Sequence, residues 1–208
     1  MCQPNFRIRM KITNSTTLSS YPVFPDWVFE GTAQLTPEII RSIVDDVEVL
    51  KANGNYTDTV FGWTTNKHAR QSQIGKNIVK ASQYVGGLFF ENAVSHFRLR
   101  NKNRKMEIPD IWMYGIKPNG MIPQNVEKVR WYQCVLFLQT VENGSSLYLD
   151  LHSSKLHNTP PNVQETTHYI KPEANKLVCF PAHIPWGFTP NNSMIDTVVL
   201  CCNFTLSD

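Results

Sequence analysis

Histidines and carboxylates are the side chains of this chain that could hold a metal ion, and one pair of them stands close together in the sequence. Asp150 and His152 are separated by one residue within 146–152, a segment whose composition is typical of a β-strand. Alternate residues of a strand point to the same face, so this carboxylate and this imidazole should lie side by side. They could be two ligands of a first-row metal ion. A surface or interface pair has the same pattern, and we favour that interpretation.

The other histidines carry weaker signals. His68 and His96 fall in the half of the chain that is predicted to be helical, and neither has a partner at metal-ligand spacing. His157 and His168 flank the loop 153–165, and we interpret them as ordinary loop residues. The sequence contains no Gly-x-x-x-x-Gly-Lys phosphate loop, no Gly-x-Gly-x-x-Gly turn and no Gly-x-Ser-x-Gly elbow. No catalytic residue is therefore predicted from these motifs.

The five cysteines form no Cys-x-x-Cys pair, and their number is odd. Cys134 lies within Cys-Val-Leu-Phe-Leu and could be a thiol nucleophile served by a distant histidine, but such an apolar setting favours a packing role. Apolar surroundings predict buried free thiols in a reducing compartment rather than disulfides or metal ligands. The cysteines are Cys2, Cys134, Cys179, Cys201 and Cys202.

Charge and hydropathy exclude several classes of protein. The chain of 208 residues has 20 Lys and Arg against 17 Asp and Glu, a net charge of +3, which is too small for a protein that coats nucleic acid. The basic run 98–105 is interpreted as a solvated loop or helix end, so nucleic acid is not an expected partner. No apolar run reaches the roughly 20 residues of a membrane helix. The N-terminus lacks a secretory signal, so we expect a protein that is neither secreted nor membrane-bound.

Two helices and a β-rich half are expected. Apolar residues at helical spacing predict helices within 36–54 and 71–96, separated by a loop over 55–70. Residues 1–35 form an extended lead-in, and 36–208 form a single domain with helices in 36–97 and a β core in 108–206. The fold class is α+β, mainly β, with the helices packed on one sheet. Strands are expected at 110–117, 131–140, 146–152, 166–170, 176–180, 187–189 and 196–206.

One part of the β-rich half resembles a known family. Leu-Val-Cys-Phe-Pro at 177–181, Gly-Phe-Thr-Pro-Asn at 187–191 and Thr-Val-Val-Leu-Cys-Cys-Asn at 197–203 resemble the last strands of the iron(II)/2-oxoglutarate oxygenases encoded by tailed phages and some bacteria. The segments 111–118 and 134–138 resemble earlier core strands. The resemblance implies a double-stranded β-helix, a jelly-roll of two facing sheets.

The family holds iron(II) with two histidines and a carboxylate, and it anchors 2-oxoglutarate with a basic side chain. The resemblance places Asn125 and Glu127 at the position of the His-x-Asp or His-x-His pair, Trp186 at the second histidine, and Thr197 near the basic anchor. A neutral amide is a poor iron ligand, and an indole offers only an N–H donor. The expected assignment is therefore no catalytic residue, no metal and no cofactor.

Two functions follow from the resemblance. The first is a non-catalytic, oxygenase-like jelly-roll that acts as a structural or assembly module, such as a neck or tail connector subunit of a phage virion. It would be located in the virion or the host cytoplasm and would contact protein, as a homo-oligomer or ring. The alternative is an active iron(II)- and 2-oxoglutarate-dependent dioxygenase, a hydroxylase, with an atypical triad drawn from His183, Asp150, His152 and Glu127. A carbohydrate- or peptide-binding jelly-roll is a third interpretation, and it requires an exposed aromatic shelf.

Overall fold

The computed structural model describes residues 18–23, 26–67, 74–97, 105–126, 130–139, 142–150 and 167–207. No helix among these residues has the length and apolar character needed to cross a lipid bilayer. Several positions that the sequence singles out lie outside the described residues: Cys2, His68, Glu127, His152, His157, the loop 153–165, and the basic run 98–105 apart from Lys105.

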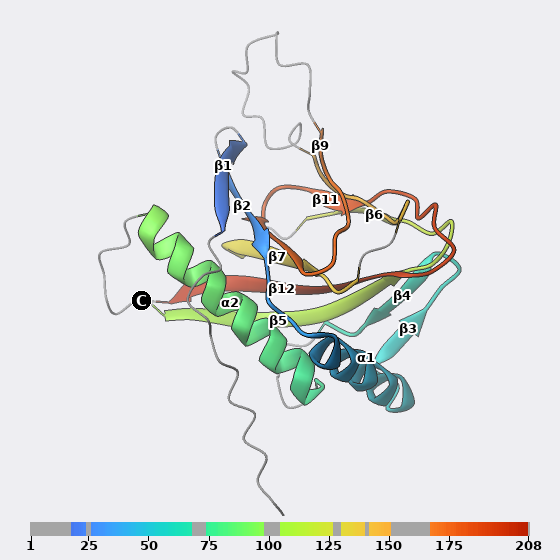
Figure 1. Cartoon of the computed structure of the whole chain (residues 1–208). Coiled ribbons are helices and arrows are strands. Elements are labelled where there is room, and N and C mark those ends of the chain that lie inside the picture. The colour runs from blue at the N-terminus through green and yellow to red at the C-terminus, as the bar shows by residue number, and fades with distance from the viewer. Residues whose placement is uncertain are drawn as a thin grey trace, which may run out of the picture.

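Two β-sheets make up the body of the molecule (Figure 1). The larger sheet has the strand order β1-β2-β10-β7-β12-β5-β4-β3, and the smaller has the order β6-β11-β8-β9. The strands are β1 (Ser19–Val23), β2 (Asp26–Thr32), β3 (Tyr56–Asp58), β4 (Gly62–Thr65), β5 (Lys105–Ile116), β6 (Ile122–Asn125), β7 (Tyr132–Phe137), β8 (Leu147–Asp150), β9 (Thr167–Ile170), β10 (Lys176–Pro181), β11 (Trp186–Phe188) and β12 (Thr197–Ser207).

From β5 onward the chain passes back and forth between the two sheets. β5, β7, β10 and β12 belong to the large sheet, whereas β6, β8, β9 and β11 belong to the small one. Every pairing is antiparallel. This alternation is the topology of a double-stranded β-helix, so the predicted fold class is confirmed.

Two helices, α1 (Pro37–Ala52) and α2 (Lys76–His96), cover the face of the large sheet that points away from the small sheet (Figure 1). The buried face of α1 carries Ile43, Val47 and Leu50 at helical spacing. Phe89 of α2 stacks on Phe204 of β12, with ring centroids 5.0 Å apart. The predicted packing of both helices on one sheet is confirmed.

A carboxylate from α1 fixes the start of α2. Asp46 accepts hydrogen bonds from the backbone N–H groups of Asn77 (2.6 Å) and Ile78 (3.1 Å). Both N–H groups belong to the first turn of α2, where backbone N–H groups have no acceptor within the helix. Gly86 and Gly87 lie within α2 without interrupting it, although two adjacent glycines can mark a kink. Gly86 allows a close approach to β5, because a Cβ there would lie 3.0 Å from the side chain of Ile108.

Two segments differ from the expectation, and the extended lead-in strand expected within 1–35 is present as two strands. Residues 55–70 contain the hairpin of β3 and β4, which extends the large sheet beyond β5, so the prediction of a loop was wrong. β6 was not predicted, because Pro123 and two amides interrupt its pattern. The lead-in 1–35 contributes β1 and β2, and β2 pairs with β10. β3, β4 and β6 are only three or four residues long, so an alternation of apolar and polar residues is hard to recognise in them.

Candidate functional site

The strands of the small sheet bring two of the family positions together. In the β6–β11 ladder Asn125 lies directly opposite Trp186, and Ile122 lies opposite Phe188, with an irregularity between the two pairs. β8 flanks β11 on its other side, where Leu149 lies opposite Trp186. Residues paired in this way send their side chains to the same face of a sheet. The ladder therefore brings Asn125 and Trp186 to one place.

The Trp186 side chain fills the space between the two sheets. It is fully buried. Its ring lies 6.2 Å from those of Tyr114 and Phe180 and 5.9 Å from that of Phe188, measured between centroids. Among the described residues its indole N–H has no hydrogen-bond acceptor. An indole has no lone pair to offer a metal ion, so this position serves packing.

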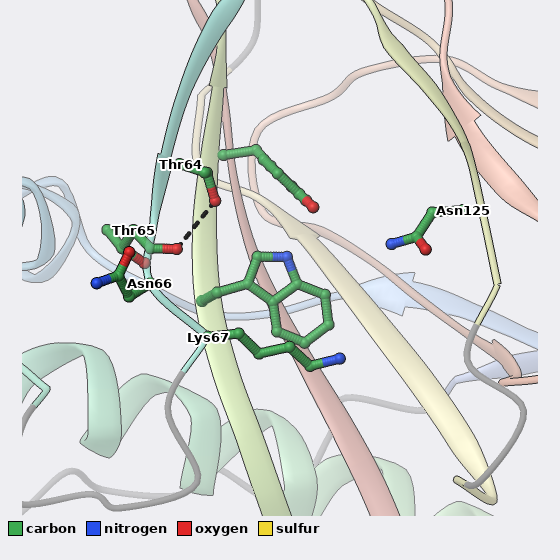
Figure 2. Close-up of a pocket in the computed structure, with 7 residues that line it drawn as sticks. Thr64, Thr65, Asn66, Lys67 and Asn125 are labelled. Atoms are coloured by element: carbon green, nitrogen blue, oxygen red, sulfur yellow. Dashed lines mark hydrogen bonds between the residues drawn. The ribbon is translucent and has the colours of Figure 1, made fainter. Parts of the chain in front are cut away.

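Asn125 marks one wall of a pocket of about 240 Å³ at the open edge between the sheets. Its side-chain Oδ1 accepts a hydrogen bond of 2.8 Å from the N–H of Val126. Figure 2 shows Asn125 across the pocket from Thr64, Thr65 and Lys67. The pocket is lined by Thr64, Thr65, Asn66, Lys67, Trp112, Tyr114 and Asn125.

Lys67 forms the charged part of this pocket. Its ammonium lies 4.6 Å from the centre of the Trp112 ring, close enough for a cation–π interaction. The same Nζ is 3.9 Å from a carboxylate oxygen of Asp110. The Trp112 side chain is buried, so it presents no open aromatic shelf to a carbohydrate or a peptide.

A row of polar side chains crosses three strands of the large sheet next to this pocket. Asn203 of β12 lies opposite Asp110 of β5 on one side and opposite Gln133 of β7 on the other. Each of the three is two residues from a side chain of its own strand that packs between the sheets, namely Trp112, Val135 and Cys201, so all three point into the jelly-roll. Asp110 accepts hydrogen bonds from Arg130 (2.9 Å) and Asn203 (3.1 Å). The Gln133 amide and the Asn203 Oδ1 have no partner among the described residues.

The pKa of Asp110 reflects this environment. Burial acts to raise the pKa of the carboxyl group, but hydrogen bonds from Arg130 and Asn203 and the charge of Lys67 outweigh it, so the pKa lies below its ordinary value. Asp110 is therefore a carboxylate at neutral pH. With two cations around it, the group is a local structural anchor rather than a proton carrier.

Thr197 occupies the position near the expected co-substrate anchor. It is fully buried at the first position of β12, and its hydroxyl oxygen accepts a hydrogen bond of 3.0 Å from the N–H of Ser145. The neighbouring interior is filled by Phe137 and Phe188, whose ring centroids are 6.1 Å apart. The site offers no positive charge to an incoming carboxylate at Thr197.

Two of the alternative ligands, Asp150 and His183, lie among the described residues, whereas His152 and Glu127 do not. Asp150 accepts a hydrogen bond of 2.7 Å from the Gln124 amide. His183 is exposed on the turn after β10, and His168 lies 3.8 Å from the carboxylate of Glu30. Within the described part of the chain no three His, Cys, Asp or Glu side chains are placed to share a metal ion. His96, at the end of α2, packs against Trp27 instead.

The described residues at the expected positions do not fit the family's iron(II) ion. Two of the positions expected to hold it carry an amide and a buried indole, and the third, Glu127, lies outside the described residues. Thr197 is neutral and buried, so it offers no basic anchor for the carboxylate of 2-oxoglutarate.

Four cysteines are buried free thiols. Cys134 lies directly opposite Cys179 on one neighbouring strand and Cys202 on the other, so three thiols stand in a row beneath the helices. Burial, followed by hydrogen bonding to the two neighbouring thiols, raises the pKa of Cys134 well above its ordinary value. Burial likewise raises the pKa of Cys201. Such thiols are inert, which agrees with the packing role expected from the sequence.

Sequence comparisons return no relatives: no family model matches the chain, and no curated protein matches it. Solved structures do match. A prolyl-4-hydroxylase from Pseudomonas putida is 14% identical with a TM-score of 0.56, over 86% of this chain and 91% of that one. A prolyl hydroxylase from Trichoplax adhaerens, in complex with a hypoxia inducible factor peptide, is 14% identical with a TM-score of 0.57, over 85% and 83%.

A viral enzyme matches as well. The collagen prolyl hydroxylase of Paramecium Bursaria Chlorella virus-1 is 11% identical with a TM-score of 0.51, and the match covers 85% of this chain and 94% of that one. Other matching structures include a member of the 2OG-Fe(II) oxygenase family from Burkholderia pseudomallei. The chain thus has the double-stranded β-helix fold of the 2-oxoglutarate- and iron-dependent oxygenases. At these identities the likeness concerns the fold.

Proposed function

We propose that this chain is a non-catalytic member of the oxygenase fold that works by contacts with protein. The observation that carries the proposal is the pairing of Asn125 with Trp186, because it puts an amide and a buried indole where the family's iron ligands are expected. Neither side chain can replace an imidazole at a ferrous ion. A fold that loses its catalytic groups can still serve as a scaffold, since fold does not fix function.

The same proposal extends to the kind of assembly in which the chain works. We propose a homo-oligomer or ring, with a neck or tail connector of a phage virion as the setting and the virion or host cytoplasm as the location. Its support is the resemblance of 177–203 to oxygenase-like proteins encoded by tailed phages, together with large apolar side chains that the surface exposes, such as Met194 and Val60.

The test is a direct assay for iron binding and for turnover of 2-oxoglutarate, neither of which a non-catalytic chain should show. Purified protein is incubated with iron(II) and 2-oxoglutarate under nitrogen, freed of unbound metal, and analysed for iron; succinate production is then followed after oxygen is admitted. We expect no stoichiometric iron and no succinate above the level of free iron(II). One equivalent of bound iron, with turnover of 2-oxoglutarate, would overturn the proposal.

The second candidate is an active dioxygenase with an atypical triad built from His183 with Asp150, His152 or Glu127. The observation in its favour is the fold shared with prolyl hydroxylases over most of both chains. The same assay decides between the two. If iron binds and 2-oxoglutarate is consumed, the variant His183→Ala should abolish both activities, and this candidate then replaces the first.

A further inference from the structure

One end of the jelly-roll, on the right of Figure 1, is formed by loops between strands. Large apolar side chains on these loops are exposed to solvent. They belong to three loops, namely 59–61 between β3 and β4, 117–121 between β5 and β6, and 189–196 between β11 and β12. Met194 is 91% exposed and Val60 is 80% exposed. We call the set the apolar tip: Val60, Phe61, Met121, Met194 and Ile195.

Hydrogen bonds join two of these loops through one buried residue. The backbone N–H of Asn191 donates to the carbonyl of Gly120 (2.8 Å), and the N–H of Asn119 donates to the carbonyl of Asn191 (2.7 Å). The Asn191 side-chain amide donates to the carbonyls of Ile116 (2.7 Å) and Ile195 (2.8 Å). The loops 117–121 and 189–196 therefore form one connected surface.

The third loop is held against the other two. The N–H of Lys117 donates to the carbonyl of Phe61 (3.2 Å). Gly120 passes so close to the same carbonyl that a Cβ at this position would overlap its oxygen. The hydroxyl of Thr59 accepts from the N–H groups of Phe61 and Gly62, which fixes the turn itself. The apolar tip is thus a preformed surface, and presenting it to a partner requires little ordering.

The apolar tip carries no charge. The loops 59–61, 117–121 and 189–196 contain two ionisable side chains, Lys117 and Asp196, each at one end of its loop, and Asp196 accepts a hydrogen bond of 3.0 Å from the indole of Trp63. The charged groups at its margin are engaged: Asp58 forms a 2.6 Å salt bridge with Lys117. An uncharged apolar centre with charged groups at its edge is the pattern of a protein–protein interface. A nucleic acid or an anionic bilayer would instead require Lys and Arg at the contact.

We propose that the apolar tip is the surface through which two copies of this chain associate. A surface without charges is complementary to itself, because two copies can meet there without repulsion between like charges and without burying an unpaired charge. A two-fold contact of this kind places the same patch of both copies at the interface. The inference rests on the proposed function in one respect, that the chain works by contacts with protein.

The test is the self-association of the full chain, measured by sedimentation velocity over a range of concentrations. The variant Val60→Glu/Met194→Glu introduces charges at two exposed positions of the tip, where the fold should tolerate them. Val49→Glu is the matched control, since Val49 is 58% exposed on α1, outside the tip. We expect a dimer that the tip variant weakens by about a hundredfold or more, while the control dimerises like the native chain.

Three outcomes would overturn the inference: a native chain that stays monomeric up to ~100 μM, a dimer that survives in the tip variant, or a dimer that the control weakens equally. A monomeric chain that binds phosphatidylcholine vesicles through the tip would also overturn it, in favour of a lipid surface. The iron and succinate assay is independent of these results. The chain can therefore fail as a dimer and remain non-catalytic, or dimerise and prove to be an enzyme.

Discussion

Trp186 and Asn125 are direct partners across the β6–β11 ladder, and Trp186 lies fully buried between the two sheets. The pair joins the beginning of β11 to the end of β6 at the open edge of the jelly-roll. Their juxtaposition means that the backbone still brings two separate segments to one point. What differs from a ferrous site is the chemistry of the side chains, and this can be changed by substitution.

The variant Asn125→His/Trp186→His should create a metal site. It places two imidazoles on directly paired residues, and the native Glu127 or the further change Glu127→Asp supplies a carboxylate two residues along the chain. We expect the variant to bind one equivalent of cobalt(II) or nickel(II) with micromolar affinity, about 8 kcal/mol of binding free energy. The affinity is measured by titrating the variant with cobalt(II) and recording the visible absorption of the bound ion.

Single variants are the controls for this site. Asn125→His and Trp186→His each supply one imidazole, so each should bind the ion at least about tenfold more weakly than the double variant. Equal binding by a single variant and the double variant would show that the two positions do not share an ion. The register that links these strands to the oxygenase site would then be wrong.

Loss of the Trp186 ring should destabilise the protein strongly. Trp186→Ala leaves a cavity between the sheets and should lower the free energy of unfolding by about 3–5 kcal/mol. Trp186→Phe retains much of the ring and removes an indole N–H that has no acceptor among the described residues, so its cost should be about half or less. Urea denaturation followed by circular dichroism measures both. Similar losses in the two variants would contradict the packing role.

Asp110 should make the stability depend on acid pH. Its pKa is lower in the folded chain than in the unfolded chain, so its stabilising contribution is present above about pH 4 and is lost as the pH falls through the lowered value. Asp110→Asn removes this titration. We expect the free energy of unfolding of the variant to fall less steeply than that of the native chain below about pH 4. If the free energy of unfolding fell equally steeply with pH in the variant and in the native chain, Asp110 would not be the source of the acid sensitivity.

The buried thiols should resist modification. In a Cys2→Ser background four cysteines remain, all buried in the fold. Burial raises the pKa of Cys134 and of Cys201, so few thiolates are present at pH 8. We expect negligible reaction with Ellman's reagent in buffer and full reaction in guanidinium chloride. Rapid modification of the folded chain would reveal an open or reactive thiol.

Asn191 should connect stability to the apolar tip. Asn191→Ala leaves two backbone carbonyls without their donor and should lower the free energy of unfolding by about 1–3 kcal/mol. Because the loops that Asn191 joins carry Met121 and Met194, the variant should also dimerise more weakly, although it changes no exposed side chain. Calorimetry and sedimentation velocity measure the two effects. Unchanged stability would show that the amide does not hold the loops.

The long periodic elements could be predicted from the sequence. α1 and α2 follow from apolar residues at helical spacing, and β7, β10 and β12 from apolar and β-branched runs. These elements are the ones that bury a face in the core. Their signal is strong because burial selects the residue type at each position.

Less of the candidate site could be predicted from the sequence. The polar row of Gln133, Asn203 and Asp110 arises from the register of β5, β12 and β7, which no local pattern specifies. Lys67 reaches Trp112 only because β4 extends the large sheet, and the residues of β4 were predicted to be a loop. A polar residue at an inward position of an otherwise apolar strand, such as Gln133, was the one signal available beforehand.

The packing of aromatic side chains around Trp186, between the two sheets, has a consequence for evolution. An enzyme has to keep a hollow, hydrated site ready for its substrate, and such a site costs thermodynamic stability. Under the proposed non-catalytic function no such site has to be kept, and Trp186, Phe137 and Phe188 can fill the space between the sheets without that cost. On that proposal, the exposed loops can diverge under selection for contacts with protein, while the packed core beneath them is retained.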